Sequence, residues 1–536
     1  MRGYGADCAH SFQVTQGRML TNTSGVVSEL TPTYSHLLII HSVWARVAGE
    51  SSHRRQRFPI RSLLTGLRDS SIVSQAEITG ICDMDPVKSG TEPASAVSEQ
   101  PPLLRALGLW DTTAIVMGIM IGSAIFIVPA EVTREVGSER AALSVWIISG
   151  LLSLFGALSF AELAAMLPQA GGQYVYLREA YGHLVSFLCG WTFFLAVQSG
   201  GISTVAVGFA QYLADFFPIH PGQQKLAASL AIVVLTAINY RGVREAGWVQ
   251  SVLTGAKVGA MVAIVALGFA LVHGPVYSTV RLPTPAGWGF LSSFGVAMVA
   301  ALWAYDGWNN GTFAADEVRN PERNLPLGLI LGTAGVVVIY ILVNLVYYHV
   351  LPLLTVAQSP RVAAEAGMRL FGRGGAHWVT LAIIVAMLGC VNGMILAGAR
   401  VYYAMARDGL FFRWCGNVHP RFRTPHLSLL FQGAWAVLLV LLGTYEQLFT
   451  YVIFAGWIFY ALTVLAVIIL RRKRPDLPRP YRVSGYPFVP AAFLIAAACF
   501  ILNTLLARPL EAGIGCGIVA LGIPAYLLWK HRSGAA

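Results

Sequence analysis

The most constraining feature of this sequence is an apolar run, Leu109 to about Ala130, with a glycine and a serine near its centre. The run is long enough to cross a bilayer as one helix, which takes about 20 residues. Gly122 and Ser123 are unfavourable there, because glycine loses more backbone entropy in a helix than any other residue. In hydrocarbon, backbone groups freed by a break must find partners other than water. The run indicates either a break beside a polar cavity or a small-residue face for close helix packing.

A second apolar run, Ser292 to about Ala315, is interrupted by residues 305–310, YDGWNN. The two interrupted runs occupy matching places in two halves of the chain. Such a pair is typical of secondary transporters, which bind their substrates near the membrane midplane between discontinuous helices. The second run therefore favours a broken helix over a packing face in the first.

The composition indicates that most of the chain lies in lipid. Of the 536 residues, 56% are hydrophobic and only 12% are charged, whereas soluble proteins carry about 25% charged residues. Apolar segments separated by short polar joints indicate an all-α membrane protein with about twelve transmembrane helices. We expect these spans at about residues 109–130, 140–166, 184–214, 225–240, 247–272, 292–315, 326–351, 377–405, 427–443, 447–470, 487–507 and 511–529.

The net charge of +11 could suggest nucleic acid, but the basic residues follow membrane topology instead. An even number of spans places both termini on one side. One set of alternate loops carries roughly eighteen Arg and Lys residues against eight in the other, and the excess marks the cytoplasmic side. We therefore expect both termini in the cytoplasm and no nucleic-acid partner.

Residues 1–102 differ from the rest of the chain and are expected to form a disordered cytoplasmic tail. Their best apolar run, residues 37–40, is far too short to span a membrane. The segment also lacks the basic start and apolar core of a signal peptide. Translation could begin at Met84, from which a short polar lead reaches the first span.

Motifs for metal, disulfide or nucleotide chemistry are absent from the sequence. The 7 cysteines are scattered and include no CxxC pair, so they indicate neither a disulfide framework nor a zinc site. We expect each to be a small core residue. A GxxxxGK[ST] phosphate loop and an HExxH metal motif are also missing. We expect no enzyme activity, no metal and no cofactor.

Several longer motifs point to a known family. Residues 301–310, ALWAYDGWNN, are followed by Glu317 and by residues 320–326, NPERNLP. Further motifs are residues 161–163, 167–168, 171–177, 179–182, 406–410, 479–483 and 485–487. Together they resemble the L-type amino acid transporters of the amino acid–polyamine–organocation superfamily.

This resemblance covers about residues 103–529 and implies how the helices are organised. The family's fold has five helices repeated in inverted orientation, with discontinuous first and sixth helices. The permease domain is then expected at residues 103–532. Its repeats would take about residues 109–272 and 292–472, and two appended helices about residues 487–529.

The resemblance also implies a site for a zwitterionic amino acid at the two breaks. The half-helix after the first break would present free N–H groups and a positive dipole end to the carboxylate. The expected donors are Gly122, Ser123 and Ala124, with help from the Ser123 hydroxyl. Carbonyl groups at Met120 and around Trp303 and Asp306 would accept from the ammonium group. The family usually has glycine where Ala124 stands, and the extra methyl group would restrict the size of the substrate.

Two side chains have further roles by resemblance. Trp303 takes the position of the family's aromatic gate over the substrate, although a large core residue is the alternative. Lys257 lies near the middle of the fifth span, where an ionisable group is expected to be functional. It matches the lysine of sodium-independent members, whose ammonium projects where sodium-coupled relatives hold an ion. Lys257 would neutralise carbonyl groups at the first break, so we expect sodium-independent transport.

Other polar residues within the spans have simpler explanations. Asp306 could carry a proton or select a cationic side chain, but capping of the half-helix after it is favoured. Glu162 and Arg400 are expected to be packing or interfacial charges. Asn392 could line the site, although a helix-to-helix hydrogen bond is favoured. The GxxxG motif of residues 255–259 is expected to serve helix packing.

The sequence thus predicts a secondary active transporter of L-amino acids in the cytoplasmic membrane, working by alternating access. Sodium-independent exchange or facilitated transport of neutral amino acids is expected. The alternatives are a proton-coupled amino acid or polyamine symporter using Asp306, and a non-transporting amino acid sensor. Animal L-type transporters bond a glycoprotein through a cysteine between the third and fourth spans. The corresponding loop here, about residues 215–225, has no cysteine, so no disulfide-linked subunit is expected.

Overall fold

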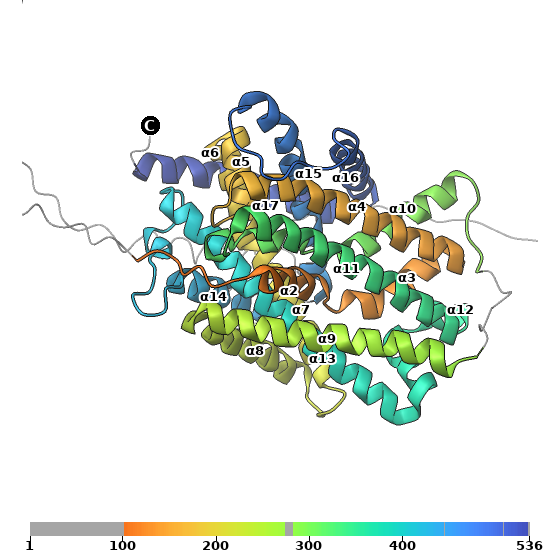
Figure 1. Ribbon diagram of the computed structural model, residues 1–536. Coiled ribbons are helices and arrows are strands. Elements are labelled where there is room, and N and C mark those ends of the chain that lie inside the picture. The colour runs from red at the N-terminus through yellow and green to blue at the C-terminus, as the bar shows by residue number, and fades with distance from the viewer. Residues whose placement is uncertain (1–100, 274–281, 444, 508, 534–536) are drawn as a thin grey trace, which may run out of the picture. The chain divides into compact units, whose positions relative to one another are not determined.

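The computed structural model describes residues 101–273, 282–443, 445–507 and 509–533. Within these ranges the chain forms helices and turns, without a β-strand. Most of the helices run between the same two ends of the bundle (Figure 1). The expected tail, apart from its last two residues, and the possible start at Met84 lie outside the described residues.

Ten helices in the described part of the chain are long and apolar enough to cross a membrane. A bent pair, α2 (Leu109–Met120) and α3 (Ala124–Val136), makes one further span. The shorter apolar helix α14 (His426–Leu442) lies at the ninth predicted position. Seven of the ten lie before α15: α4 (Glu139–Met166), α6 (His183–Thr192) continued by α7 (Gln198–Leu213), α8 (Pro221–Arg241), α9 (Val243–Leu271), α10 (Trp288–Ala304) with a 3-10 turn to Thr312, α11 (Pro321–Val350), and residues Gly374–Arg407 of α13 (Val362–Arg407). The other three are parts of α15 (Tyr445–Lys473), α16 (Phe488–Ala507) and α17 (Pro509–Ser533). The predicted all-helical membrane fold is confirmed.

The joint between α3 and α4 shows how the sequence ends one span and starts the next. Gly137 adopts φ 63°, the left-handed conformation that commonly ends a helix at glycine. Ser138 then caps α4, because its hydroxyl oxygen accepts from the Ala141 N–H at 3.4 Å. The chain reverses within these few residues. Shorter helices in other joints were not predicted; they are α5 (Gln173–Tyr181) and α12 (Leu353–Gln358).

Helices from the two halves of the chain pack against one another. Helix α11 packs against α4 and α2, and α13 packs against α9 and α7. In Figure 1, α2 lies between α11 and α9, both of which it contacts. Helices α16 and α17 both pack against α15, and they also contact α4 and α6 respectively. The first broken helix is therefore enclosed by helices of both halves.

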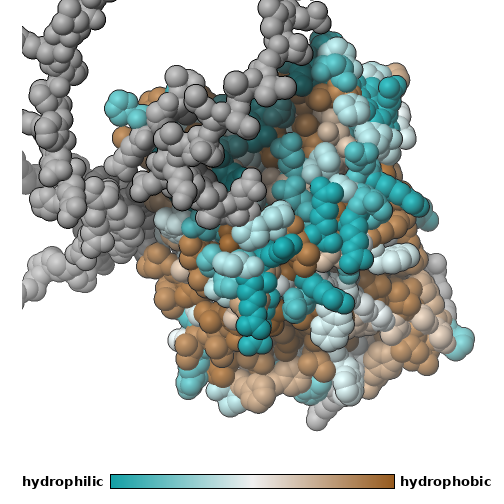
Figure 2. Space-filling view, turned by 60° about the vertical axis from the view of Figure 1, so that its left-hand side comes forward, coloured by the Kyte–Doolittle hydropathy of each residue, from teal (hydrophilic) through white to brown (hydrophobic). Residues whose placement is uncertain are grey.

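The outer surface of the bundle suits a membrane. Hydrophobic side chains cover much of the face in Figure 2, and hydrophilic ones gather toward its upper part. Trp110 and Trp248 are 76% and 67% exposed near the starts of α2 and α9. Trp288, at the start of α10, is 86% exposed at the other end of the bundle. Exposed tryptophans at both ends resemble the aromatic belts of membrane proteins.

Two expectations about small residues are wrong. Cys499 and Cys516 are exposed on the appended helices, whereas the other three cysteines in the described ranges are buried. A small apolar side chain is compatible with a helix face turned toward lipid. A side chain at Gly255 or Gly259 would meet no atom within 4 Å. The GxxxG motif therefore does not pack helices together within this chain.

A buried ion pair joins the chain after α10 to α13. The Arg400 Nε and Nη2 groups donate to the two carboxylate oxygens of Glu317 at 2.8 and 2.9 Å, and neither side chain is exposed. The Glu317 carbonyl accepts from the N–H groups of Ala106 and Leu107, both at 2.9 Å. Of the two expected roles for Arg400, the structure shows a packing charge and not an interfacial one.

Glu162 is also a packing charge. Its side chain is 1% exposed at the end of α4. Arg471 of α15 donates to its carboxylate at 2.6 and 2.8 Å, and the Val483 N–H donates at 2.7 Å. This carboxylate therefore fixes the joint between α15 and α16 against α4.

The buried Arg400–Glu317 ion pair leads to a prediction about stability. Arg400→Met leaves the Glu317 carboxylate buried without its partner, which costs about 3–5 kcal/mol. We expect a clear drop in the thermal unfolding temperature of the detergent-purified protein. The double variant Arg400→Met, Glu317→Met should recover most of the loss, because no unpaired charge remains. Arg482→Met, at an exposed position, is the control. Equal stability of the single variant and the wild type would contradict the prediction.

Candidate functional site

The first span is broken where the sequence predicts it. Helix α2 ends at Met120, Ile121 takes φ −80° and ψ 85°, and α3 begins at Ala124. The two helices are bent by 46° relative to each other. The break frees backbone carbonyl groups at the end of α2 and N–H groups at the start of α3.

Lys257 neutralises the carbonyl side of this break. Its side chain is 1% exposed in α9. The Nζ atom donates to the carbonyls of Gly118 and Ile121 at 2.6 and 2.9 Å, and to that of Ala386 in α13 at 3.2 Å. A cation is stabilised at the carboxyl end of a helix, where the carbonyl dipoles converge. The ammonium group thus lies where the sequence places it and joins α2, α9 and α13.

The remaining carbonyls at the end of α2 also have partners. The Cys390 thiol donates to the Ile119 carbonyl at 3.0 Å. The Tyr340 hydroxyl donates to the Met120 carbonyl at 2.9 Å, and the Gly122 N–H donates to the same oxygen at 3.0 Å. Side chains from α13 and α11 therefore hold the broken end of α2 in place.

The N–H side of the break is open. Among the described residues, no group accepts a hydrogen bond from the Ser123 or Ala124 N–H. Both lie at the amino end of α3, where the helix dipole favours an anion. Of the three expected carboxylate donors, these two are therefore unpaired, whereas the Gly122 N–H is already used by Met120.

The sixth span is also broken, but its second part is not an α-helix. Helix α10 ends at Ala304, and the chain continues as two short 3-10 turns, Trp308–Thr312 and Ala315–Glu317. The side chains of Asn310 and Thr312 bond to backbone carbonyls within the first turn at 3.2 and 2.8 Å. Such local bonds compete with the α-helical pattern.

Gly307 allows the two breaks to touch. Its φ of 103° is a conformation that residues with side chains rarely adopt. A Cβ atom at this position would lie 2.6 Å from Ile119 Cγ2, at the end of α2. Only glycine therefore permits this close approach of the sixth span to the first.

The structure does not support the favoured role of Asp306 as a cap. Gly307 takes the cap position of the following turn, which has no side-chain cap bond. The turn starts one residue later than capping by Asp306 requires. The Asp306 carboxylate instead accepts from the Tyr460 hydroxyl of α15 at 2.8 Å.

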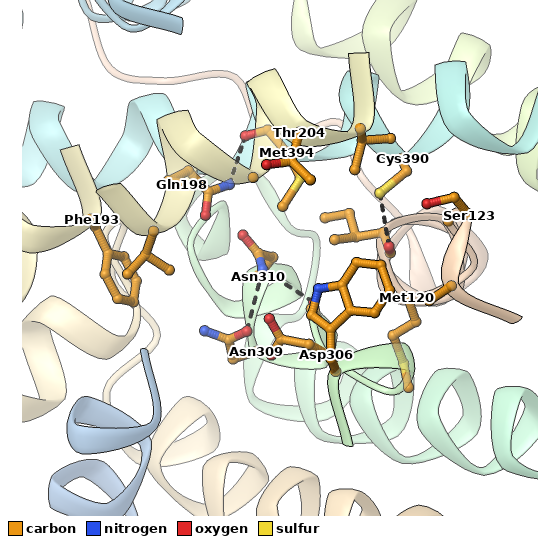
Figure 3. Close-up of a pocket in the computed structure, with 18 of the residues that line it drawn as sticks. Met120, Ser123, Phe193, Gln198, Thr204, Asp306, Asn309, Asn310, Cys390 and Met394 are labelled. Atoms are coloured by element: carbon orange, nitrogen blue, oxygen red, sulfur yellow. Dashed lines mark hydrogen bonds between the residues drawn. The ribbon is translucent and has the colours of Figure 1, made fainter. Parts of the chain in front are cut away.

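A cavity lies between the two breaks, with a volume of about 60 Å³. A water molecule needs about 10–15 Å³ on this measure, so the space exceeds that of a single water. In Figure 3, Ser123 and Met120 lie on one side, Gln198 and Phe193 on the other, and Asp306 below. Every residue expected to bind substrate lines this cavity, namely Met120, Gly122, Ser123, Ala124, Trp303 and Asp306.

Sequence reasoning missed the wall opposite the first break. Gln198 and Thr204 of α7 and Tyr460 of α15 line the cavity. Polar side chains within apolar spans were the available signal. Phe193 and Val197 belong to a π-turn between α6 and α7 that no sequence pattern indicated. Such turns are frequent at functional sites.

Asn392 forms the favoured helix-to-helix hydrogen bonds and is not among the residues that line the cavity. Its Nδ2 atom donates to Gln250 Oε1 at 2.8 Å, and its Oδ1 atom accepts from Asn239 at 2.8 Å. Asn392 therefore ties α13 to α9 and α8.

Apolar spans with two discontinuous helices around a polar cavity define the class of secondary transporters with a central site. The family model described as amino acid permease matches residues 107–513. The chain therefore belongs to the amino acid permease family, and the predicted resemblance is confirmed. It is a multi-pass membrane transporter of amino acids.

Three relatives show the extent of this similarity. The serine/threonine exchanger SteT of Bacillus subtilis (strain 168) is 33% identical over 444 residues, or 82% of this chain and 100% of SteT. The b(0,+)-type amino acid transporter 1 of Mus musculus is 32% identical over 440 residues, covering 80% and 88%. The large neutral amino acids transporter small subunit 2 of Homo sapiens is 30% identical over 443 residues, covering 80% and 82%.

The environment of Lys257 makes a prediction. Lys257→Met leaves the Gly118 and Ile121 carbonyls buried without donors, at a cost of about 1–3 kcal/mol for each group. We expect a lower unfolding temperature and at least about a tenfold loss of labelled amino acid uptake in proteoliposomes. Lys225→Met is the control, because Lys225 contacts the Leu441 carbonyl at an exposed position. Normal stability and uptake of Lys257→Met would show that the ammonium group is dispensable.

Proposed function

We propose that this protein exchanges neutral L-amino acids across the cytoplasmic membrane, without sodium and by alternating access. One observation carries the proposal: at the first break the carbonyl groups have hydrogen-bond partners, whereas two N–H groups have none among the described residues. The Lys257 ammonium satisfies carbonyls on one face, and the Ser123 and Ala124 N–H groups open on the cavity from the other. This arrangement can accept an anion and has no need of a cation.

An amino acid brings a carboxylate and an ammonium group, and neither can leave water without a partner. The Ser123 and Ala124 N–H groups, with the Ser123 hydroxyl, suit the carboxylate. The ammonium group would bind at carbonyls of Met120 and Trp303 and near the Asp306 carboxylate. A carbonyl oxygen has two lone pairs, so a group that already accepts one bond can accept a second.

The position of Lys257 supports sodium independence. Its Nζ atom lies within 3.2 Å of three carbonyl oxygens from α2 and α13. These oxygens would otherwise be suitable ligands for a monovalent cation. A sodium ion placed among them would be repelled by the ammonium group at short range.

Exchange of neutral amino acids is supported by two findings. The similar SteT protein is named a serine/threonine exchanger. The second finding is the small cavity, which is lined in part by Ala124 and suits a small substrate. Trp303 also lines the cavity, where it would act as a gate over the substrate.

The second candidate function is proton-coupled symport of amino acids or polyamines through Asp306. Its support is that the Asp306 carboxylate lines the cavity and contacts the Tyr460 hydroxyl at 2.8 Å. A carboxylate there could carry a proton or pair with a cationic substrate.

The proposed orientation places both termini in the cytoplasm. Its support is the excess of basic residues in one set of loops. The proposal includes no disulfide-linked subunit, because the expected loop of about residues 215–225 contains no cysteine, nor do residues 214–220 between α7 and α8.

Ion replacement tests the coupling. Uptake of labelled serine into proteoliposomes preloaded with unlabelled serine should be unchanged when choline replaces sodium. It should also be independent of an imposed pH gradient. Loss of uptake in choline would refute sodium independence. Stimulation by an inward proton gradient, abolished in Asp306→Asn, would establish the symporter instead.

The gate makes a separate prediction. Trp303→Ala should reduce exchange at least about tenfold with little change in unfolding temperature, because the ring faces a cavity. Trp457→Ala is the matched control, since that ring is 5% exposed and packs on Phe493 and Phe500. The control should lose stability, because large-to-small changes of a buried tryptophan cost about 3–5 kcal/mol. Unchanged exchange by a correctly inserted Trp303→Ala would exclude the gate.

A further inference from the structure

Two residues that line the cavity each hold a buried polar atom without a hydrogen bond within the described part of the chain. The atoms are Oγ1 of Thr204 in α7 and Oδ1 of Asn310 in the turn after α10. The two side chains are only 3% and 4% exposed, and neither atom has a partner among the described residues. Unpaired groups of this kind are rare in proteins and call for an explanation.

Other hydroxyl groups of the same span are mostly paired, and Ser199 Oγ, which also lacks a hydrogen bond among the described residues, does not belong to a residue that lines the cavity. The Thr192 hydroxyl donates to the Leu188 carbonyl at 2.7 Å. The Ser203 hydroxyl donates to the Ser199 and Ala436 carbonyls, both at 2.8 Å. Bonding to the preceding turn is the usual habit of helical Ser and Thr. The Thr204 hydroxyl instead has no partner among the described residues, and Thr204 lines the cavity.

Asn310 is held so that only its oxygen remains available. Its Nδ2 atom donates to the Gly307 carbonyl and to Asn309 Oδ1, each at 3.2 Å. Both of its hydrogen-bonding protons therefore have acceptors. In Figure 3 Asn310 lies near the middle of the cavity, between Asn309 below and the α7 wall that carries Thr204.

The cavity leaves little room for a long side chain, because its volume is about 60 Å³. A Cβ atom at Gly201, one turn before Thr204, would lie 2.6 Å from Met394 Cε of α13. Helices α7 and α13 are therefore in close contact at this position. Ser123, Ala124 and Thr204 all line this one small cavity, so a substrate with its carboxylate at Ser123 and Ala124 can direct its side chain toward Thr204.

We propose that Thr204 and Asn310 form the side-chain subsite, which selects amino acids with a short side chain bearing a hydroxyl or carboxamide group. This inference rests on the proposed function, which places the α-carboxylate at the first break. A hydroxyl or carboxamide group both donates and accepts hydrogen bonds. It can donate to Asn310 Oδ1 and accept from the Thr204 hydroxyl. An apolar side chain of the same shape leaves both protein groups buried and unpaired.

Competition between isosteric pairs tests the subsite. The wild-type protein in proteoliposomes would exchange labelled serine in the presence of threonine or valine, of asparagine or leucine, and of serine or 2-aminobutyrate. The polar member of each pair should compete at least about tenfold better, since the apolar member leaves two buried groups unpaired. Thermal stabilisation of the detergent-purified protein by each amino acid measures binding independently of transport.

Thr204→Val keeps the shape of the side chain and removes its hydroxyl group. In this variant, we expect threonine to compete with labelled serine only about twofold better than valine does. Competition by valine itself should be unchanged or improved. Thr204→Ser retains the hydroxyl and should keep the wild-type preference for threonine over valine. Thr192→Val is the matched control, because that threonine lies in the same span and does not line the cavity.

Different outcomes separate this inference from the proposed function. Active exchange in which valine competes as well as threonine would overturn the subsite and leave the proposed exchange intact. The subsite would also be overturned if threonine outcompeted valine as strongly in Thr204→Val as in the wild type. If no amino acid of the panel is exchanged or stabilises the protein, the proposed function fails and the subsite with it.

Discussion

Backbone hydrogen bonding at the break in the first span is the constraint on which this structure depends. A helix can be interrupted inside a membrane only where other groups satisfy the freed backbone. Lys257, Cys390 and Tyr340 satisfy the carbonyl groups at the end of α2. Because these side chains come from α9, α13 and α11, the break also determines how the surrounding helices pack. The Ser123 and Ala124 N–H groups remain unpaired among the described residues, and under the proposed function they would receive the substrate carboxylate.

The second break lies close to the first, and residues of both breaks line one cavity. Gly307 approaches Ile119 so closely that a side chain would not fit. The chain then turns through short 3-10 segments to Glu317, whose carboxylate is bound by Arg400. The same glutamate accepts through its carbonyl from the residues just before α2. Both broken spans are therefore tied to each other at the cavity and again near the start of the first span.

Much of the fold could be predicted from the sequence, because apolar length and glycine placement act locally. The runs around Gly122 and Gly307 indicated both breaks. The depth of Lys257 in an apolar span indicated a functional residue, and the family resemblance implied its carbonyl partners. Long-range packing could not be predicted in this way. Glycines 255 and 259 fit a packing motif but face open space. Thr204 lies in a helix that follows a π-turn and packs on α13, and no sequence pattern indicated either feature.

The position of a bound amino acid tests the central claim most directly. A cryo-electron microscopy structure with a bound amino acid would locate its carboxylate. This account predicts carboxylate oxygens within hydrogen-bonding distance of the Ser123 and Ala124 N–H groups, with Lys257 still bound to the Gly118 and Ile121 carbonyls. An amino acid bound outside the cavity between the breaks, or a carboxylate paired with Lys257, would contradict it.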